Sequence, residues 1–160
     1  MKVFKFGGAS VKEATGVKNI LSVLKFTGFE NTLIVVSAMG KTTNALEQVV
    51  HSFFENKTQY TQDLETVREN HLRIIEELFK TAPSEILLKV NALFDSVLTF
   101  LRTTDADEYS LIYDQVVSLG ELVSTTIISH YMQQEGIENT WLDARECIQT
   151  DAYYRDANLN

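Results

Sequence analysis

Cysteine, proline and tryptophan are the scarcest residues of this sequence, with one of each among 160 residues. The lone Cys147 excludes a disulfide within one chain, so a reducing compartment and a cytoplasmic location are expected. Basic residues are also few, since 14 lysines and arginines stand against 22 aspartates and glutamates, for a net charge of −8. This balance argues against non-specific binding to nucleic acid or to an anionic membrane. Any anionic ligand would need a local positive site.

Long apolar runs, a signal-peptide pattern and paired histidines are absent as well. No run approaches the roughly 18 apolar residues of a membrane-spanning helix, so no membrane partner is expected. The histidines, His51, His71 and His130, lie at no metal-binding spacing from one another, and no metal ligand is predicted. Because 44% of the residues are hydrophobic, one domain with a genuine core is expected.

The first residues of the chain predict a strand, a turn and a helix. Residues 3–6 predict a buried strand, and Gly7 and Gly8 then allow a sharp turn with free N–H groups beside Lys5. Such a turn can bind phosphate, although two glycines between a strand and a helix more often form only a tight connection. Residues 11–24 follow at helical spacing, and Gly28 is a stop signal.

A second strand and a polar loop complete this N-terminal unit. Residues 32–36 are a continuous β-branched run that predicts a fully buried parallel strand, and hence a βαβ crossover. Residues 37–44 form a small polar loop at the carboxyl end of that strand, where open α/β sheets bind ligands. We therefore expect the two loops to lie side by side. A Walker A loop is rejected, because the glycine required five positions before Gly40 is Val35.

The rest of the chain predicts mainly helices. Apolar stripes predict a helix over 43–54 and an αα-hairpin over 60–103, with Pro83 in the first turn of its second helix. The stripes, including His71, are interpreted as core rather than as a cofactor site. Residues 108–135 predict a helix interrupted at Gly120, and residues 140–142 predict a short strand. The last dozen residues predict a loop that enters a further strand.

Glu121 is a candidate ligand-binding residue in the interrupted helix. If the helix continues through Gly120, Glu121 and Ser124 fall near one face. A carboxylate beside small residues leaves room for a ligand. By local pattern alone, an exposed surface glutamate is the more common case.

Four blocks, taken in order, give this chain a resemblance to the aspartokinases. They are Lys5-Phe-Gly-Gly-Ala-Ser10, Val36-Ser-Ala-Met39 through Thr43-Asn44, Ser118-Leu-Gly-Glu121 with Ser124, and Leu142-Asp-Ala-Arg145. The resemblance implies an α/β amino-acid-kinase fold, a three-layer α/β/α sandwich with a mainly parallel sheet, here incomplete and carrying the helical hairpin as an insertion. It also implies transfer of the ATP γ-phosphoryl group to the β-carboxylate of L-aspartate, the first step towards lysine, threonine and methionine.

The first block is implied by this resemblance to bind the phosphates of ATP. Lys5 is implied as the catalytic residue, and Lys5, Gly7, Gly8 and Ser10 as the ATP phosphate-binding residues, with Mg²⁺ accompanying ATP. Phosphoryl transfer needs positioning and charge stabilisation more than covalent chemistry, and a lysine at the transfer point supplies both. Ala9 departs from the family, which usually has threonine or serine there.

The second and third blocks are implied to bind aspartate. Ser37, Ala38 and Thr43 match the aspartate-contacting loop, and Glu121 matches the glutamate that pairs with the substrate ammonium. An acidic residue there favours an amino acid over a plain dicarboxylate. Tyr154 stands where the family commonly has glycine.

Residues 1–160 are therefore interpreted as the N-terminal, aspartate-binding part of one amino-acid-kinase domain, from a homo-oligomeric parent. The ATP-binding half, with its Arg-Gly-Gly-Ser-Asp stretch, and the ACT regulatory domains are absent from the chain, which alone is expected to be inactive. One alternative is another enzyme of the same fold with a different acceptor. The other is a non-catalytic interaction module that binds through the hairpin over 60–103.

Overall fold

The N-terminal part of the protein, up to Val36, is a βαβ unit, as predicted. The computed structural model describes residues 1–55, 58–81 and 83–159. The unit consists of β1 (Lys2–Phe6), a short 3-10 helix η1 (Gly8–Val11), α1 (Ala14–Thr27) and β2 (Thr32–Val36). The two strands pair in parallel over their whole length, from Lys2 opposite Thr32 to Phe6 opposite Val36. Gly28 ends α1 with a φ of +75°, a conformation that glycine adopts without strain.

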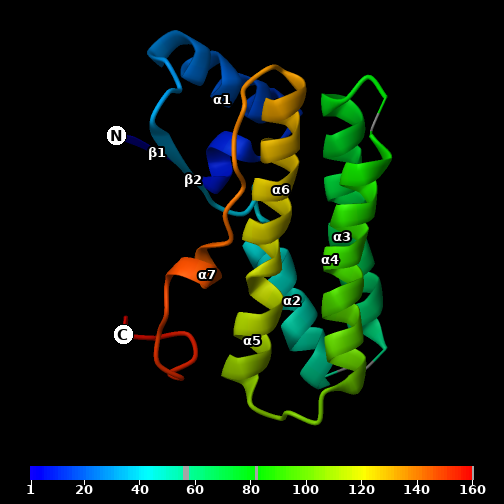
Figure 1. The fold of residues 1–160 in the computed structure, drawn as a ribbon. Helices are drawn as coiled ribbons and strands as arrows, with labels where there is room; N and C mark the ends of the chain where they lie inside the picture. The colour runs from blue at the N-terminus through cyan, green and yellow to red at the C-terminus, as the bar shows by residue number, and fades with distance from the viewer. Residues whose placement is uncertain (56–57, 82, 160) are drawn as a thin grey trace.

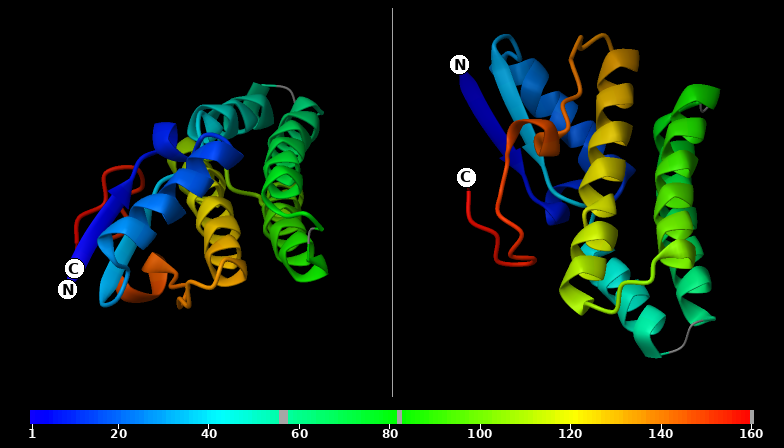
Figure 2. Two further views of the ribbon diagram at one scale, coloured as in Figure 1. Left: turned by 90° about the horizontal axis from the view of Figure 1, so that it is seen from above. Right: turned by 60° about the horizontal axis from the view of Figure 1, so that its bottom comes forward.

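Helices make up most of the chain after β2. Among the described residues they are α2 (Thr42–Glu55), α3 (Gln59–Leu78), α4 (Ser84–Thr103), α5 (Tyr109–Val117), α6 (Leu119–Gln134) and α7 (Ala144–Cys147). Helix α6 runs through the middle of the molecule, with the two strands on one side and α3 and α4 on the other (Figures 1 and 2). The structure is thus an incomplete α/β fold with a small parallel sheet.

The sheet is buried on one face only, so the predictions of a buried strand over residues 3–6 and of a fully buried strand over residues 32–36 were wrong. Phe4, Phe6 and Ile34 pack against the core, and Val36 is buried. On the opposite face Val3, Leu33 and Val35 are 58%, 45% and 43% exposed. The reason is the two-residue period of a strand, which sends alternate side chains to opposite faces. Within the described residues, helices cover only one of those faces.

Helices α3 and α4 form the predicted αα-hairpin. Their apolar stripes are core, because Phe94 is fully buried and the ring of His71 lies 6.0 Å from it. Arg68 of α3 holds the two helices together through Asp95 of α4 at 2.7 Å and through the face of Phe94 at 5.4 Å. Pro83 occupies the N-cap position of α4, whereas the sequence predicted it in the first turn.

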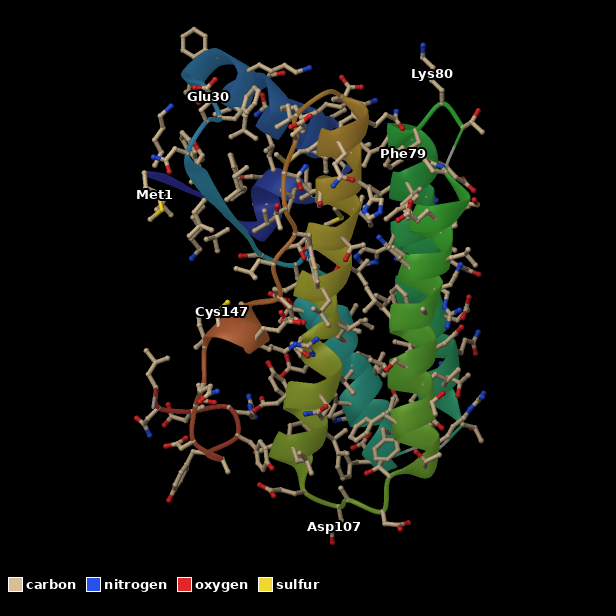
Figure 3. All side chains as sticks on the ribbon, viewed as in Figure 1. Met1, Glu30, Phe79, Lys80, Asp107 and Cys147 are labelled. Atoms are coloured by element: carbon tan, nitrogen blue, oxygen red, sulfur yellow. The ribbon has the colours of Figure 1, made fainter. Side chains whose placement is uncertain are left out.

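Two consecutive residues at the end of α3, Phe79 and Lys80, point in opposite directions. Phe79 ends α3 and packs edge-on against Tyr131 of α6, at 5.6 Å between ring centroids. The next residue, Lys80, points away from the protein (Figure 3). The hairpin is therefore fastened to α6 from its turn as well as along its length.

The break between α5 and α6 falls at Ser118 and not at Gly120, where it was predicted. Gly120 lies inside α6 because the helix passes very close to its neighbours there. A Cβ on Gly120 would stand 2.7 Å from Cβ of Ala38, a distance that real Cβ atoms do not adopt. The glycine is therefore required for close packing and not for a turn.

Helices α5 and α6 together are the most apolar part of the chain. The stretch Tyr109–Gln134 has the length and composition of a membrane-spanning helix, contrary to the expectation from sequence. However, 56% of its most apolar window is buried inside the protein. Core packing thus accounts for its composition.

The predicted strand over residues 140–142 is not formed. Gly136, with a φ of +78°, follows the end of α6, and the chain then runs extended without pairing to a strand in the described residues. Trp141 instead donates its indole N–H to Oγ1 of Thr125 on α6, at 2.9 Å. This segment therefore packs on a helix and does not extend the sheet.

The C-terminal segment after α7 is a loop, as predicted. Its ends are joined by an antiparallel bridge between Thr150 and Leu159. Arg155 fastens the loop to α5 in two ways. Its guanidinium group lies 4.2 Å from the ring centroid of Tyr113, and its backbone N–H donates to Oδ2 of Asp114 at 3.0 Å. Cys147, on α7, is free and exposed.

Candidate active site

The loop after β1 and the loop after β2 lie side by side, as predicted. The strand pairing continues past the sheet, because the N–H of Ser37 donates to the carbonyl oxygen of Phe6 at 3.1 Å. The N–H of Gly40 then donates to the carbonyl oxygen of Gly8 at 3.0 Å. Parallel strands end at the same edge of a sheet, so the polar residues of both loops gather there.

Close contact between the loops also explains the second glycine of the Gly7-Gly8 pair. A Cβ on Gly8 would stand 2.7 Å from the carbonyl oxygen of Ala38, whereas a Cβ on Gly7 would meet nothing within 4 Å. Gly7 is extended, and Gly8 opens η1, in which the N–H of Ser10 donates to the carbonyl oxygen of Gly7 at 2.8 Å. The turn after β1 is therefore a 3-10 turn that lets two backbones approach.

Glu121 reaches the second loop from α6. The N–H of Ala38 donates to Oε1 of Glu121 at 3.2 Å. The hydroxyl of Ser124 lies 3.0 Å from the carbonyl oxygen of Ser37 and 3.1 Å from that of Glu121 itself. The second and third sequence blocks thus meet through direct hydrogen bonds, as the first and second do through their backbones. Glu121 is exposed and lies in the first turn of its helix, where the helix dipole favours a negative charge.

Lys5 and Thr43 border these loops from two other elements. Lys5 lies on β1 opposite Val35, so its side chain is on the exposed face of the sheet. Among the described residues, no hydrogen bond or ion pair engages its ammonium group. Thr43 is exposed in the first turn of α2. Ser10 is also exposed, on η1. Ser37, Ala38 and Glu121 are therefore joined by contacts, while Lys5, Ser10 and Thr43 are exposed around them.

Two residues near this site were not predicted from sequence as part of it. Thr42, the first residue of α2, is buried and its Oγ1 lies 3.4 Å from Nε2 of His71 on α3. His71 was predicted to be a core residue, and it is buried, at 2% exposure. Nothing in the sequence links two residues that are 29 positions apart. The only sequence signal was the histidine itself on an apolar stripe.

The fourth block is held together by its own charges. Arg145, at the start of α7, places Nη2 2.6 Å from Oδ2 of Asp143 and Nε 3.0 Å from Oδ1. Hydrogen bonds from Arg145 lower the pKa of the Asp143 carboxyl group below its usual value. Arg145 also borders a hollow of about 300 Å³ between α4 and α6, to which Ser118 contributes. This hollow contains none of the residues that join the two loops.

Metal-binding residues are not gathered at the site. Among the described residues, no group of three or more histidine, cysteine, aspartate or glutamate side chains is placed to hold a metal ion. The candidate residues therefore offer the Glu121 carboxylate, the Lys5 ammonium group, hydroxyl groups and backbone amides. Such a set can bind and orient a charged small molecule, and the lysine can stabilise negative charge that develops during a reaction.

Known proteins resemble this chain in sequence and in fold. Aspartokinase 1, chloroplastic, of Arabidopsis thaliana is 34% identical over 157 residues, which cover 94% of this chain and 27% of that protein. The bifunctional aspartokinase/homoserine dehydrogenase 2 of Escherichia coli is 25% identical over 150 residues, which cover 94% of this chain and 18% of that protein. The chain thus spans a minor part of these relatives.

Crystal structures of E. coli aspartokinase III have the same fold over the whole chain. The complex with lysine and aspartate matches with a TM-score of 0.87, and the complex with aspartate and ADP with 0.86, both at 22% identity. In each case 100% of this chain and 35% of the other is covered. The model of the amino acid kinase family matches residues 1–160. The chain therefore belongs to the amino acid kinase family.

Proposed function

We propose that the protein containing this chain is an aspartokinase, which transfers the ATP γ-phosphoryl group to the β-carboxylate of L-aspartate. Residues 1–160 supply the aspartate-binding part of its kinase domain. The observation that carries this proposal is the hydrogen bond from the Ala38 N–H to the Glu121 carboxylate. The similarity to aspartokinases, including E. coli aspartokinase III in complex with aspartate and ADP, supports the choice of substrate.

Glu121 is suited to binding the substrate ammonium group. Its Oε1 is held by the Ala38 amide, so the carboxylate is oriented before a ligand arrives. The side chain is exposed and can form a charge-assisted hydrogen bond with an ammonium group. Neighbouring Ser37 and Thr43 add hydroxyl groups. A plain dicarboxylate has no ammonium group to pair with Glu121, so its negative charge would repel the carboxylate. Glu121 therefore favours an amino acid as the substrate.

Lys5 is suited to stabilising the transferred group. It lies on the strand that leads into the Gly7-Gly8 turn, and its ammonium group has no partner among the described residues. A positive charge at the transfer point stabilises the phosphoryl group as negative charge develops. Gly7, Gly8 and Ser10 offer backbone N–H groups or a hydroxyl group close by. We assign these residues to the phosphates.

ATP and Mg²⁺ are proposed as the remaining reactants. Mg²⁺ is usually bound through substrate phosphates and one or two carboxylates. The described residues contain no cluster of metal ligands, so we assign no metal ligand to this chain. When bound, ATP would supply the phosphoryl group, and Mg²⁺ would neutralise part of the phosphate charge. This part of the protein binds the acceptor and contributes Lys5.

The decisive test is the kinetics of Glu121 variants in the intact protein that carries this chain. Glu121→Gln keeps the shape but removes the charge, and we expect the KM for aspartate to rise at least about tenfold, since a charge-assisted pair is lost. The KM for ATP should change less than about twofold. Glu69→Gln, on the exposed side of α3, is the matched control. Equal changes in both KM values would contradict ammonium binding by Glu121.

Lys5 is tested by its effect on turnover. We expect Lys5→Ala to lower kcat on the order of 100-fold, because one stabilising donor at the transfer point is lost. Lys80→Ala, at the exposed hairpin turn, should behave like the wild type. Wild-type turnover in Lys5→Ala would remove the catalytic role. ADP release measured with a panel of carboxylates and amino acids would identify another acceptor, if the enzyme uses one.

Location and assembly are proposed on narrower grounds. A cytoplasmic location is supported by the single cysteine, whereas relatives from Arabidopsis are chloroplastic proteins. A homo-oligomeric parent follows from the family resemblance alone. Cell fractionation tests the first proposal, and light scattering of the intact protein tests the second.

A further inference from the structure

His71 is a buried histidine whose ring makes two polar contacts. Its Nδ1 lies 2.8 Å from the carbonyl oxygen of Val67, one turn earlier in α3, and its Nε2 lies 3.4 Å from Oγ1 of Thr42. A carbonyl oxygen can only accept, so Nδ1 carries the proton. Nε2 of a neutral ring is then an acceptor, and the Thr42 hydroxyl donates to it. Burial lowers the pKa of His71, in agreement with a neutral ring.

The methyl group of Thr42 packs against α6. Its Cγ2 lies 3.3 Å from the place where a Cβ on Gly120 would stand. The same place is 2.7 Å from Cβ of Ala38, so Thr42 and Ala38 both pack onto the backbone of Gly120. Gly120 directly precedes Glu121, whose carboxylate accepts the Ala38 N–H. Thr42 therefore lies between His71 on one side and the Ala38–Glu121 pair on the other.

The two branches of Thr42 together fix its side chain. Threonine has few χ1 states, and rotation to another state moves the hydroxyl group and the methyl group to different positions. In the observed state the hydroxyl group meets Nε2 of His71 and the methyl group meets Gly120. Thr42 is buried, so a hydroxyl group turned away from His71 would lose its hydrogen bond inside the protein. The histidine thus favours a single rotamer.

We propose that His71 is a positioning residue of the candidate aspartate site. By accepting a hydrogen bond from the Thr42 hydroxyl group, it fixes the first turn of α2 and the packing of Thr42 against Gly120, next to the Ala38–Glu121 pair. This inference rests on the proposed function. Thr43, the neighbour of Thr42, is held by the same turn. The hairpin α3–α4 therefore supports the site through the contact between His71 and Thr42.

The test compares isosteric and conservative variants in the intact protein. Thr42→Val keeps the shape and removes the hydroxyl group, and His71→Leu removes the acceptor. We expect each to raise the KM for aspartate about fivefold, with the KM for ATP changed less than about twofold. Thr42→Ser and His71→Gln, which keep a donor or an acceptor, should restore most of the aspartate affinity. His51→Gln, at an exposed position on α2, is the matched control.

Coupling distinguishes positioning from a general loss of stability. Thr42→Val and His71→Leu remove the same interaction. The KM of the double variant for aspartate should therefore be no higher than the KM of the more impaired single variant. Additive effects, or equal effects on aspartate and ATP, would overturn the inference, as would a loss of stability with both KM values unchanged. If His71→Leu does not fold, Thr42→Val against Thr42→Ser decides the question alone.

A readout that needs no activity separates this inference from the proposed function. Nitrogen NMR of the His71 ring should show the Nδ1–H tautomer, and Thr42→Val should shift the Nε2 resonance while leaving His51 unchanged. An Nε2–H tautomer would overturn the link between His71 and Thr42. If the wild type releases no ADP with aspartate, the proposed function fails, and the positioning role fails with it. In that case the NMR result still decides the contact itself.

Discussion

The two sides of α6 differ in how completely they are packed. On the hairpin side, α3 and α4 bury their apolar stripes against each other and against α2 and α6, so that residues such as Leu64 and Phe94 are at most 1% exposed. On the sheet side, Leu33 is 45% exposed although its strand is as apolar as any helix stripe. A helix has one apolar stripe to cover, whereas a strand of continuous apolar residues has two faces.

The candidate site lies where these two sides meet. Its loops leave the end of the half-covered sheet, and its glutamate comes from α6. The hydrogen bonds of Ala38 and Ser37 to Glu121 and Ser124 cross that boundary. The well-packed side therefore holds the residues of the less packed side in place. Three comparisons can break or sharpen this contrast.

The largest expected effect comes from matched leucine substitutions on the two sides. Leu64→Ala should lower the free energy of unfolding by about 2–5 kcal/mol, because it leaves a cavity in the hairpin core. Leu33→Ala, on the exposed sheet face, should lower it by less than about 1 kcal/mol. Urea denaturation of both variants measures the difference. Equal losses would mean that something covers the sheet face in solution.

An intermediate effect is expected from glycine substitutions at the boundary. Gly120→Ala should lower the free energy of unfolding by about 1–3 kcal/mol, because its Cβ would overlap Ala38. Gly7→Ala should not destabilise the protein, since its Cβ would meet no atom within 4 Å and its φ is −78°. Thermal unfolding distinguishes the two. A stable Gly120→Ala variant would show that α6 can move away from the loops.

The smallest effect is expected from acidification through His71. Its pKa is lowered in the folded protein from an ordinary value of 6.5, so below pH 6.5 the unfolded chain binds a proton that the folded protein does not. Stability should then fall with decreasing pH, by at most about 1.4 kcal/mol per pH unit. Urea denaturation between pH 7 and pH 5, measured for the wild type, His71→Gln and His51→Gln, checks this.

The matched histidine variants show whether His71 causes the loss of stability at low pH. His71→Gln should lose this part of the slope and His51→Gln should keep it. The carboxyl group of Asp143, whose pKa is lowered from 3.8, acts only at lower pH and does not disturb the comparison. An unchanged slope in His71→Gln would show that the ring is not held neutral by burial.

Local patterns predicted the parts of the fold that depend on neighbours in sequence. The βαβ unit, the hairpin and the end of α1 at Gly28 all follow from apolar spacing and a glycine stop signal. The adjacency of the two loops followed as well, because parallel strands end at one edge. Patterns could not place the break at Ser118, since Gly120 looks like a break until its closeness to Ala38 is known.

Other features depended on partners far along the chain. Residues 140–142 have the composition of a strand, but a strand needs a neighbour, and Trp141 found Thr125 of α6 instead. The sequence suggested Ala38 only through the family resemblance. It suggested Glu121 weakly by its place beside small residues on a helix, and strongly only through that resemblance. It contained no sign of the contact between Thr42 and His71. Side-chain contacts between distant elements are set by packing, which a pattern within one element does not contain.

The bond between Ala38 and Glu121 also has a consequence for the order of folding. It joins residues 83 positions apart, and the bond from Ser124 to Ser37 spans 87. Closing a loop of that length reduces chain entropy before any contact compensates, whereas the helices and their hairpin form from neighbouring residues. We therefore expect the candidate site to assemble late, on helices that are already in place.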